Sequence, residues 1–409
     1  MSVDRLGASH QRGGTAVEAP VELRYGLNPQ QGRASAEPVT AGAWPLRALN
    51  GDPSYINLLD ALSGWRLVRE ASAALGRPVA ASFKHVSPAG AALAGPVDGP
   101  TAAFYGFDPV EGIASPLASA YVRARDADPK SSYGDFAAVS HPVDAELAAL
   151  LARVVCDGIV APGYEPGTMA ALSAKKRGRF LVLEADPTYV PPELERREIY
   201  GLRLTQARDE VPLTTELLGN VVCGQAPVPA AAAEDLLLGL AVVRDTQSNA
   251  VCYVRDGVTL GIGAGQQSRV DCTRLAGAKA AGWWLRRHPA LQAMEFGAAV
   301  RRQERVNWQV RIAEGDLTPN ERLRLAAALD VPAPEPTDED RRDWAARLTG
   351  VAFASDGALP FRDNVDHAAR YGVRWIAEPG GSLRSAEVAE ACEEHGITLV
   401  RTGLRLFQH

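Results

Sequence analysis

The chain has 409 residues, of which 46% are hydrophobic, and a formal net charge of -6 at pH 7. This length allows two or three domains with substantial cores. The acidic balance argues against a nucleic-acid-binding protein and leaves anionic small molecules open as ligands. Five scattered cysteines without Cys-x-x-Cys spacing indicate neither a disulfide framework nor a zinc site. No apolar run reaches the length of a signal peptide or a membrane span, so we expect a cytoplasmic protein in which residues 1–20 are a mobile tail.

The first predicted element after this tail is a helix. Ser54 can cap a helix that runs to about Leu75, because apolar residues recur there at helical spacing and Gly76 follows. Asn57 then lies in the first turn.

A lysine stands beside a histidine in the next segment, SFKHVSPAG. Residues 79–83 predict a short buried strand that Pro88 and Gly90 end, which places Lys84 and His85 at a strand end. Ligands are held at strand ends in α/β sheets. Because adjacent strand residues point to opposite faces, the two side chains can serve one reacting centre only if the backbone bends there. For this pair alone, a surface lysine and a packed histidine are the favoured interpretation.

Two segments share one order of predicted elements. Residues 133–163 contain an amphipathic helix that starts at Pro142, followed by a short strand with Asp157 at its start. Residues 351–381 again give a helix and then an apolar strand that ends in Pro-Gly. This loose repeat is consistent with two similar α/β/α units.

The intervening chain predicts a connection, a hairpin and a helical insertion. Residues 165–225 alternate apolar pieces with prolines and charges, which is typical of a connection between two halves. Residues 231–249 predict a helix, and an Asp-Gly pair at 256–257 predicts a hairpin turn. The chain is predicted helical from Ser268, and residues 288–350 predict a mostly helical insertion.

The segment GIGAGQQSR is a candidate phosphate site. It combines a strand end, a glycine-rich turn and a helix start that carries Arg269. Glycines allow close backbone approach, and exposed amide groups at a helix start favour phosphate. A dinucleotide site would also need an acidic residue about twenty residues later, where this chain has GWWLRRHP. We therefore reject the dinucleotide site and keep the phosphate site, with a purely structural turn as an equal alternative.

Other polar residues are weaker candidates for anion contacts. Arg24 can be a surface charge, Asn249 a helix C-cap, Asp363 an N-cap and Arg405 an edge residue. Taken singly, these structural roles are favoured. The residues alone predict an enzyme-like α/β protein with an anion pocket.

Taken together, the motifs resemble a known family. They are, in chain order, LRYGLNPQQ, LNGDPSYINLLDAL, ASFKHVSPAGAA, SSYGDF, DGIVAPGY, TQSNAVCY, GIGAGQQSRVDCTRLAGAKA, PFRDNVD and LRLFQH. In this order they resemble the formyltransferase part of the bifunctional purine-biosynthesis enzymes, 5-aminoimidazole-4-carboxamide ribonucleotide (AICAR) transformylase. The resemblance runs from about Leu23 to His409.

The resemblance implies an activity, a fold and an assembly. The activity is formyl transfer from the cosubstrate 10-formyltetrahydrofolate to the 5-amino group of AICAR. The fold is two tandem units similar to cytidine deaminase, without its zinc, over residues 21–200 and 201–409. The family is a homodimer with active sites between its subunits, so we expect Lys84 and Asn249 to act from different subunits. Because the resemblance is to the formyltransferase part alone, we expect ring closure on a separate protein.

The resemblance also implies residue roles. His85 resembles the family's general base and Lys84 its transition-state stabiliser. The positions that resemble nucleotide contacts are Arg24, Tyr25, Asn57, Gly134, Asp157, Asn249, Arg269 and Arg405. The positions that resemble folate contacts are Val270, Asp363, Ser382 and Leu383.

Two places depart from the family pattern. Ala358 and Leu359 stand where the family has two phenylalanines, one of which packs against the substrate's imidazole. Arg244 and Asp245 stand where a lysine and an aromatic residue are usual, a change we interpret as surface variation. Ala358 keeps open a relative that formylates another aminoimidazole or arylamine. A non-catalytic regulator is a third alternative, which the intact Lys84 and His85 oppose.

Overall fold

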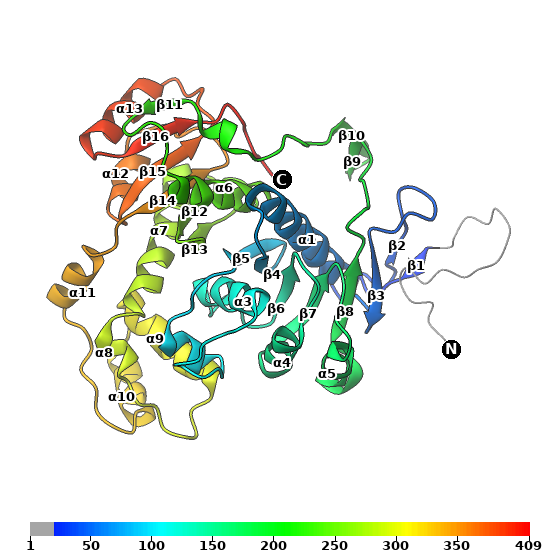
Figure 1. Ribbon diagram of the computed structural model, residues 1–409, viewed down its shortest axis with the longest axis horizontal. Helices are drawn as coiled ribbons and strands as arrows, with labels where there is room; N and C mark the ends of the chain where they lie inside the picture. The colour runs from blue at the N-terminus through cyan, green and yellow to red at the C-terminus, as the bar shows by residue number, and fades with distance from the viewer. Residues whose placement is uncertain (1–19) are drawn as a thin grey trace.

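A twelve-stranded mixed sheet forms the centre of the computed structural model, which describes residues 20–409. Helices cover both faces of this sheet (Figure 1). The strands of its first half are β3 (Leu46–Asn50), β4 (Val79–Lys84), β5 (Ser87–Leu93), β6 (Asp135–Val139), β7 (Cys156–Ala161) and β8 (Leu181–Ala185). Those of its second half are β11 (Val221–Cys223), β12 (Val251–Arg255), β13 (Val258–Gly263), β14 (Val351–Ser355), β15 (Val373–Glu378) and β16 (Thr398–Arg401).

The two halves of the sheet have the same strand order. From edge to centre they run β3-β8-β7-β6-β4-β5 and β11-β16-β15-β14-β12-β13. Each half has an antiparallel edge strand, three parallel strands and a hairpin at the centre. The halves join where β5 and β13 pair antiparallel, with Val258 opposite Ala92. The likeness of each half to cytidine deaminase and the boundary at residue 200 stay predictions.

The helices and the smaller sheets complete the chain. The helices are α1 (Tyr55–Leu75), α2 (Gly99–Phe104), α3 (Pro116–Ala127), α4 (Ala145–Arg153), α5 (Thr168–Ala174), α6 (Ala230–Arg244), α7 (Arg269–Leu285), α8 (Pro289–Gln292), α9 (Arg302–Glu314), α10 (Pro319–Ala328), α11 (Asp338–Ala345), α12 (Asp363–Ala369) and α13 (Ser385–Glu394). Two short sheets pair β1 (Val21–Glu22) with β2 (Ser35–Ala36) and β9 (Leu194–Ile199) with β10 (Leu202–Ala207). Short 3-10 turns lie at Lys175–Gly178 and Thr215–Leu218.

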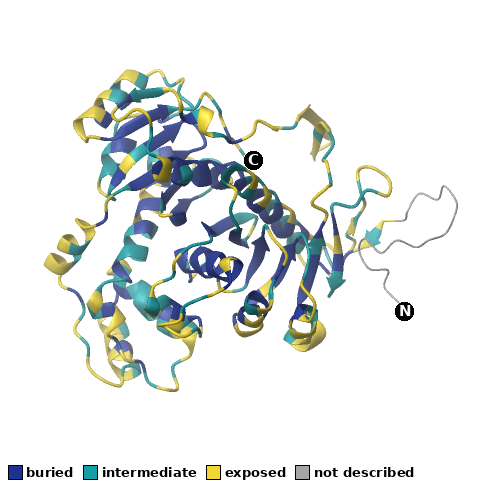
Figure 2. Cartoon of the chain, in the orientation of Figure 1, coloured by how far each residue is buried: buried dark blue, intermediate teal, exposed yellow. Residues whose placement is uncertain are grey.

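One helix of each half builds a core that both halves share. Helices α1 and α6 pack against each other, and α1 lies on β4, β6 and β7 while α6 lies on β12, β14 and β15. Leu67 of α1 and Leu236 of α6 are fully buried in this core. Two further cores lie under α3, α4 and α5 and under α7, α12 and α13. The dark strands in Figure 2 show that the sheet is buried on both faces.

The structure confirms several predicted elements. Ser54 caps α1 and exchanges hydrogen bonds with Asn57, while Gly76 ends the helix with a φ of 63°. The Asp-Gly turn joins β12 to β13, and Ser268 caps α7. Helices α8 to α11 occupy the predicted insertion.

Other predicted boundaries are wrong. Pro88 and Gly90 do not end a strand but lie buried inside β5. A Cβ on Gly90 would meet the Ala124 carbonyl at 2.1 Å, so this glycine allows the close approach of α3. Helix α4 begins at Ala145 rather than Pro142, because Asp144 provides the cap. The connection at 165–225 also contains β8, a full strand of the sheet.

The predicted tail lies outside the described residues, apart from residue 20. Within residues 20–409, every helix is too short or too polar to cross a membrane.

Candidate functional site

Candidate residues from both halves lie along one edge of the sheet. Lys84 ends β4, Gly134 precedes β6 and Asp157 is the second residue of β7. Asn249 precedes β12, and Arg269 follows β13. The antiparallel pairings bring the end of β4 beside the start of β6, and the end of β13 beside the start of β12. The site therefore lies at the amino ends of parallel β6 and β7 in the first half, contrary to the carboxyl-end position that α/β sheets favour.

The Lys84 and His85 pair lies at a strained hairpin turn. His85 and Val86 are the central residues between β4 and β5, and their φ values are 55° and 59°. Two successive positive φ values in a two-residue hairpin loop are those of a type I′ turn, which favours Asn-Gly. A positive φ is especially unfavourable for a β-branched residue such as Val86 and costs about 1–3 kcal/mol. The predicted backbone bend is present, and it is a tight turn.

A buried carboxylate beneath this turn was missed in the sequence. Asp60 of α1 is 8% exposed and accepts a hydrogen bond from the Val86 amide at 2.6 Å. Burial raises the pKa of Asp60 to about 6, although the Val86 amide, His85 and Lys84 lower it. The available signal was an acidic residue on the apolar face of the helix in YINLLDAL.

The pair opens onto a groove between the two halves. This groove of about 420 Å³ is lined by Lys84, His85, Ser131, Ile262, Ala264 and Lys279, among others. Lys84 Nζ donates to the Tyr133 carbonyl at 2.6 Å, which anchors the ammonium group at the rim. Lys279 pairs with Asp128 at 3.0 Å. The structure thus brings the Lys84 and His85 pair beside the start of the glycine-rich segment.

Arg269 and Asn249 form a second cluster that is internally satisfied. Arg269 is 7% exposed, and its guanidinium pairs with Asp356 at 2.5 Å and donates to Asn249 Oδ1 at 2.6 Å. Asn249 Nδ2 donates to the Gln266 carbonyl at 2.7 Å. This pattern favours a structural role for both residues, because the charge of Arg269 is already balanced. The predicted role of Asn249 as a helix C-cap is wrong, since α6 ends at Arg244 and Asp245 is its C-cap.

The other predicted nucleotide contacts are more accessible. Arg24 and Arg405 are exposed, and their guanidinium groups lie 4.8 Å and 4.9 Å from the ring centroids of Tyr25 and Phe407. Asn57 caps its own helix, and Asp157 pairs with Lys176 at 2.6 Å. Gly134 has a φ of 76° and open space where a Cβ would lie.

The predicted folate residues all lie in the second half. Val270 is in the first turn of α7, Asp363 begins α12, and Ser382 and Leu383 lie between β15 and α13. Asp363 Oδ1 accepts a hydrogen bond from Asn364 at 2.9 Å, and Leu383 is fully exposed. Within residues 20–409, no hydrogen bond or ion pair joins these four residues to Lys84 or His85.

The departures from the family pattern have different environments. Arg244 and Asp245 are 8% and 2% exposed and pair with Glu70 and Arg66 of α1, so their interpretation as surface variation is wrong. They form charge pairs between the two central helices. Leu359 is 1% exposed and packs in the second-half core, whereas Ala358 is half-buried. Of these two positions, only Ala358 is open to a ligand.

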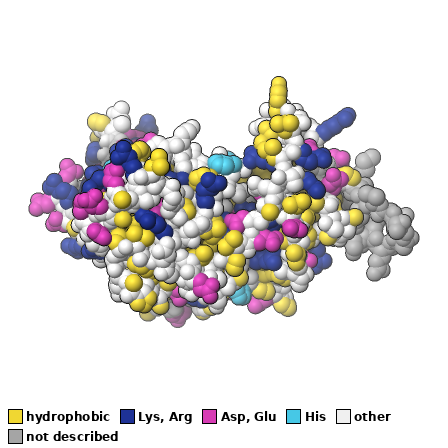
Figure 3. Space-filling model, turned by 90° about the horizontal axis from the view of Figure 1, so that it is seen from above, with side chains coloured by type: hydrophobic (Ala, Val, Ile, Leu, Met, Phe, Trp, Pro, Cys, Tyr) yellow, Lys and Arg dark blue, Asp and Glu magenta, His cyan; other side chains and the backbone are white. Residues whose placement is uncertain are grey.

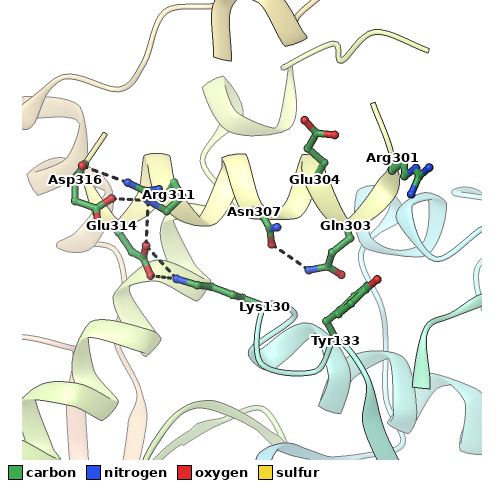
Figure 4. Close-up of a pocket in the computed structure, with 9 residues that line it drawn as sticks. All are labelled: Lys130, Tyr133, Arg301, Gln303, Glu304, Asn307, Arg311, Glu314 and Asp316. Carbon is green, nitrogen blue, oxygen red and sulfur yellow. Dashed lines mark hydrogen bonds and ion pairs between the residues drawn. The ribbon is translucent and has the colours of Figure 1, made fainter. Parts of the chain in front are cut away.

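The surface of the molecule has hollows besides the groove at Lys84 and His85. Seen from above, the molecule has a depression between two raised ends, with Lys and Arg side chains around it (Figure 3). A separate groove of about 810 Å³ lies between α9 and the loop that carries Lys130 and Tyr133 (Figure 4). Lys130 pairs with Glu314 at 3.1 Å and Arg311 with Asp316 at 2.8 Å, so most of its charges balance each other. Within residues 20–409, no group of three or more His, Cys, Asp or Glu side chains is arranged to hold a metal ion.

These features define a class: an α/β/α protein of two like halves that presents a lysine and a histidine to a groove along one sheet edge. Comparison with known sequences gives the family. The family model described as "AICARFT/IMPCHase bienzyme" matches residues 7–279, and the chain belongs to this family.

Similar curated proteins are named as bifunctional purine-biosynthesis proteins. The chain is 32% identical over 406 residues to the "Bifunctional purine biosynthesis protein PurH" of Roseobacter denitrificans, covering 97% of this chain and 61% of that protein. It is also 32% identical over 395 residues to the protein of that name from Cereibacter sphaeroides, covering 95% and 59%. The chain thus spans about three-fifths of the length of these relatives.

Proposed function

We propose that this protein transfers a formyl group from 10-formyltetrahydrofolate to the 5-amino group of AICAR, in purine biosynthesis. The observation that carries the proposal is the Lys84 and His85 pair on a strained turn, facing a groove. Residues held in unfavourable backbone conformations cluster at functional sites. Family membership supports the reaction class, because the first activity in the family's name, AICARFT, is a formyl transfer to AICAR.

The proposed chemistry divides between the two side chains. The amine of AICAR is a poor nucleophile, because its lone pair is delocalised into the imidazole and carboxamide. His85 removes a proton from this amine as its nitrogen attacks the formyl carbon. Lys84 stabilises the negative charge that develops on the formyl oxygen. The bond from the formyl carbon to folate N10 then breaks, and N10 takes the proton, so atoms and charge balance.

Binding is assigned to accessible side chains. Arg24 and Arg405 are suited to the phosphate, because both guanidinium groups are exposed and a guanidinium binds phosphate through two parallel N–H groups. Asp363 keeps one carboxylate oxygen without a partner among residues 20–409, which suits the amino and ring N–H groups of a pterin. Arg269 is assigned to hold Asn249 in place rather than to bind phosphate directly.

The proposal includes a homodimer of chains built from two cytidine-deaminase-like units. Lys84 and Asn249 lie on the same sheet edge, but β5 and β13 separate their strands. A substrate that touches both side chains is reached more simply if a second copy contributes one of them.

A single assay tests the proposal. Purified protein is incubated with AICAR and 10-formyltetrahydrofolate, and tetrahydrofolate formation is followed by absorbance. Turnover that depends on both substrates supports the proposal. Turnover with a different aminoimidazole or arylamine and none with AICAR would replace the acceptor, and the absence of transfer to any amine would overturn the reaction class.

A further inference from the structure

We propose that Asp60 is a positioning residue whose carboxylate holds the His85–Val86 turn and thereby sets Lys84 and His85 in their groove. The catalytic part of this inference rests on the proposed formyl transfer. Asp60 itself lies beneath the turn on α1, is buried, and accepts a hydrogen bond from the Val86 amide of the turn.

The contact between Asp60 and the turn is short and specific. Asp60 Oδ1 accepts from the Val86 amide at 2.6 Å, and Val86 has a φ of 59°. The residue type of Val86 opposes a positive φ, since it is β-branched, and the turn has neither Asn nor Gly at its centre. A charge-assisted hydrogen bond to the strained residue is therefore the visible force that keeps the turn in this form.

In the second half, too, a buried aspartate of the central helix accepts hydrogen bonds from the amides of a hairpin turn, but the turn sequence differs. Asp235 is the sixth residue of α6, as Asp60 is the sixth of α1. Asp235 accepts from the amide groups of Asp256 at 3.0 Å and Gly257 at 2.6 Å. That turn has the Asp-Gly sequence that forms without assistance. The shared contact is therefore required in the first half, where the turn carries the reacting side chains.

The charge state of Asp60 links the turn to pH. Burial raises its pKa to about 6, and the charged groups that face it are Lys84 from β4, His85 in the turn and Asp157 from β7. A protonated carboxyl group is a weaker acceptor for the Val86 amide than a carboxylate. The hydrogen bond by which Asp60 holds the turn therefore weakens as pH falls through about 6.

Rescue by glycine tests the positioning role. Asp60→Ala is expected to lower kcat by about 10- to 100-fold and to change KM for AICAR by less than about threefold, as for loss of a charged hydrogen bond that sets geometry. In Asp60→Ala with Val86→Gly, the glycine adopts the positive φ without strain, so most of the lost kcat should return. The matched control is Asp235→Ala, which should keep kcat within about twofold because its turn carries no reacting group.

A second measurement does not depend on activity. It tests the role of Asp60 even if the variant folds poorly or the wild type is inactive on AICAR. In protein labelled with 15N-valine, the Val86 amide shift should titrate with a midpoint near pH 6, and Asp60→Asn should abolish that titration. The inference is overturned if the pH titration of the Val86 amide shift is the same in wild type and Asp60→Asn. It is also overturned if Val86→Gly does not restore the kcat that Asp60→Ala loses. An inactive wild type whose Val86 amide still titrates refutes the proposed function and leaves Asp60 as the residue that holds the turn.

Discussion

The two hairpins at the centre of the sheet occupy equivalent places, and both turns hold two successive residues at positive φ. The residue types in the two turns differ. The β12–β13 turn uses Asp256 and Gly257, with φ values of 53° and 70°. The β4–β5 turn uses His85 and Val86 at nearly the same φ values. In one hairpin the residue types favour the conformation, whereas in the other the surrounding structure imposes it. The difference indicates that the first turn was selected for what its side chains do.

The largest expected effect is at the histidine of the first turn. His85→Ala should lower the formyl transfer rate by roughly 10²- to 10⁴-fold, because a general base contributes about that much, while AICAR affinity stays within about tenfold. Turnover is measured with both substrates and affinity by calorimetry.

The equivalent position in the second half provides the control for His85. Asp256→Ala changes the first central residue of the other turn and should leave turnover within about twofold. Equal losses in the two variants would mean that both hairpins act through stability, and the functional contrast between them would fail.

Buried and exposed arginines provide the next contrast. Arg269→Ala leaves the Asp356 carboxylate, which is fully buried, without its counter-charge and should destabilise the fold by about 3–5 kcal/mol. Arg405→Ala removes an exposed side chain and should change stability by less than about 0.5 kcal/mol. Urea unfolding measures both changes.

Ligand binding also distinguishes Arg405 from Arg269. Arg405→Ala should weaken the ribonucleotide more than its dephosphorylated nucleoside, since a charge-assisted phosphate contact is lost. Equal weakening of both ligands would assign Arg405 to the base or the fold, and a stable Arg269→Ala protein would return Arg269 to the phosphate site.

The second hairpin's carboxylate should be visible in the pH dependence of stability. Burial raises the pKa of Asp235 to about 6 from 3.8, so the folded state binds the proton more tightly than the unfolded state. The contribution of Asp235 to the free energy of unfolding is therefore full below about pH 4. It is lost as pH rises through 6, by up to about 3 kcal/mol. Asp235→Asn should remove that fall, as measured by urea unfolding between pH 4.5 and 7. An unchanged slope would show that Asp235 is not the group that titrates.

Local sequence signals predicted the elements whose cause is local. Ser54 and Gly76 bound α1, and the Asp-Gly turn lies where turn chemistry placed it. The β4–β5 hairpin was not predicted, because Asp60 and the sheet hold His85 and Val86 in place from a distance.

The same limit applies to the candidate site. A predicted strand end and the family resemblance drew attention to Lys84 and His85, but the sequence could not show that Arg269 is neutralised by Asp356, 87 residues away. It also placed Asp245 on the surface, where an ion pair with Arg66 across the two central helices buries it. Such partners are distant in sequence and are defined only by packing.

The smallest expected effect concerns Ala358, which stands where the family pattern has a phenylalanine. Ala358 follows β14 in the second half and is half-buried, whereas Leu359 beside it is fully packed. If AICAR is the acceptor, Ala358→Phe should restore a stacking contact and tighten AICAR binding by up to about tenfold, equivalent to about 1.4 kcal/mol. Leu359→Phe is the matched control, because Leu359 is packed in the core and a larger ring there should cost about 1–3 kcal/mol of stability without improving affinity.

Affinity and turnover together decide whether Ala358 marks the loss of a stacking contact with AICAR or a pocket for a different acceptor. Tighter AICAR binding with retained turnover in Ala358→Phe supports AICAR as the natural acceptor. It also shows that formyl transfer by Lys84 and His85 proceeds without the stacking contact that Ala358 lacks. A wild type inactive on AICAR that gains activity with the ring would mean that the pocket had changed its substrate while the Lys84 and His85 turn stayed the same. Loss of AICAR turnover in the variant beside an active wild type would show that the ring enters space the substrate occupies, because a filled pocket excludes what it formerly held.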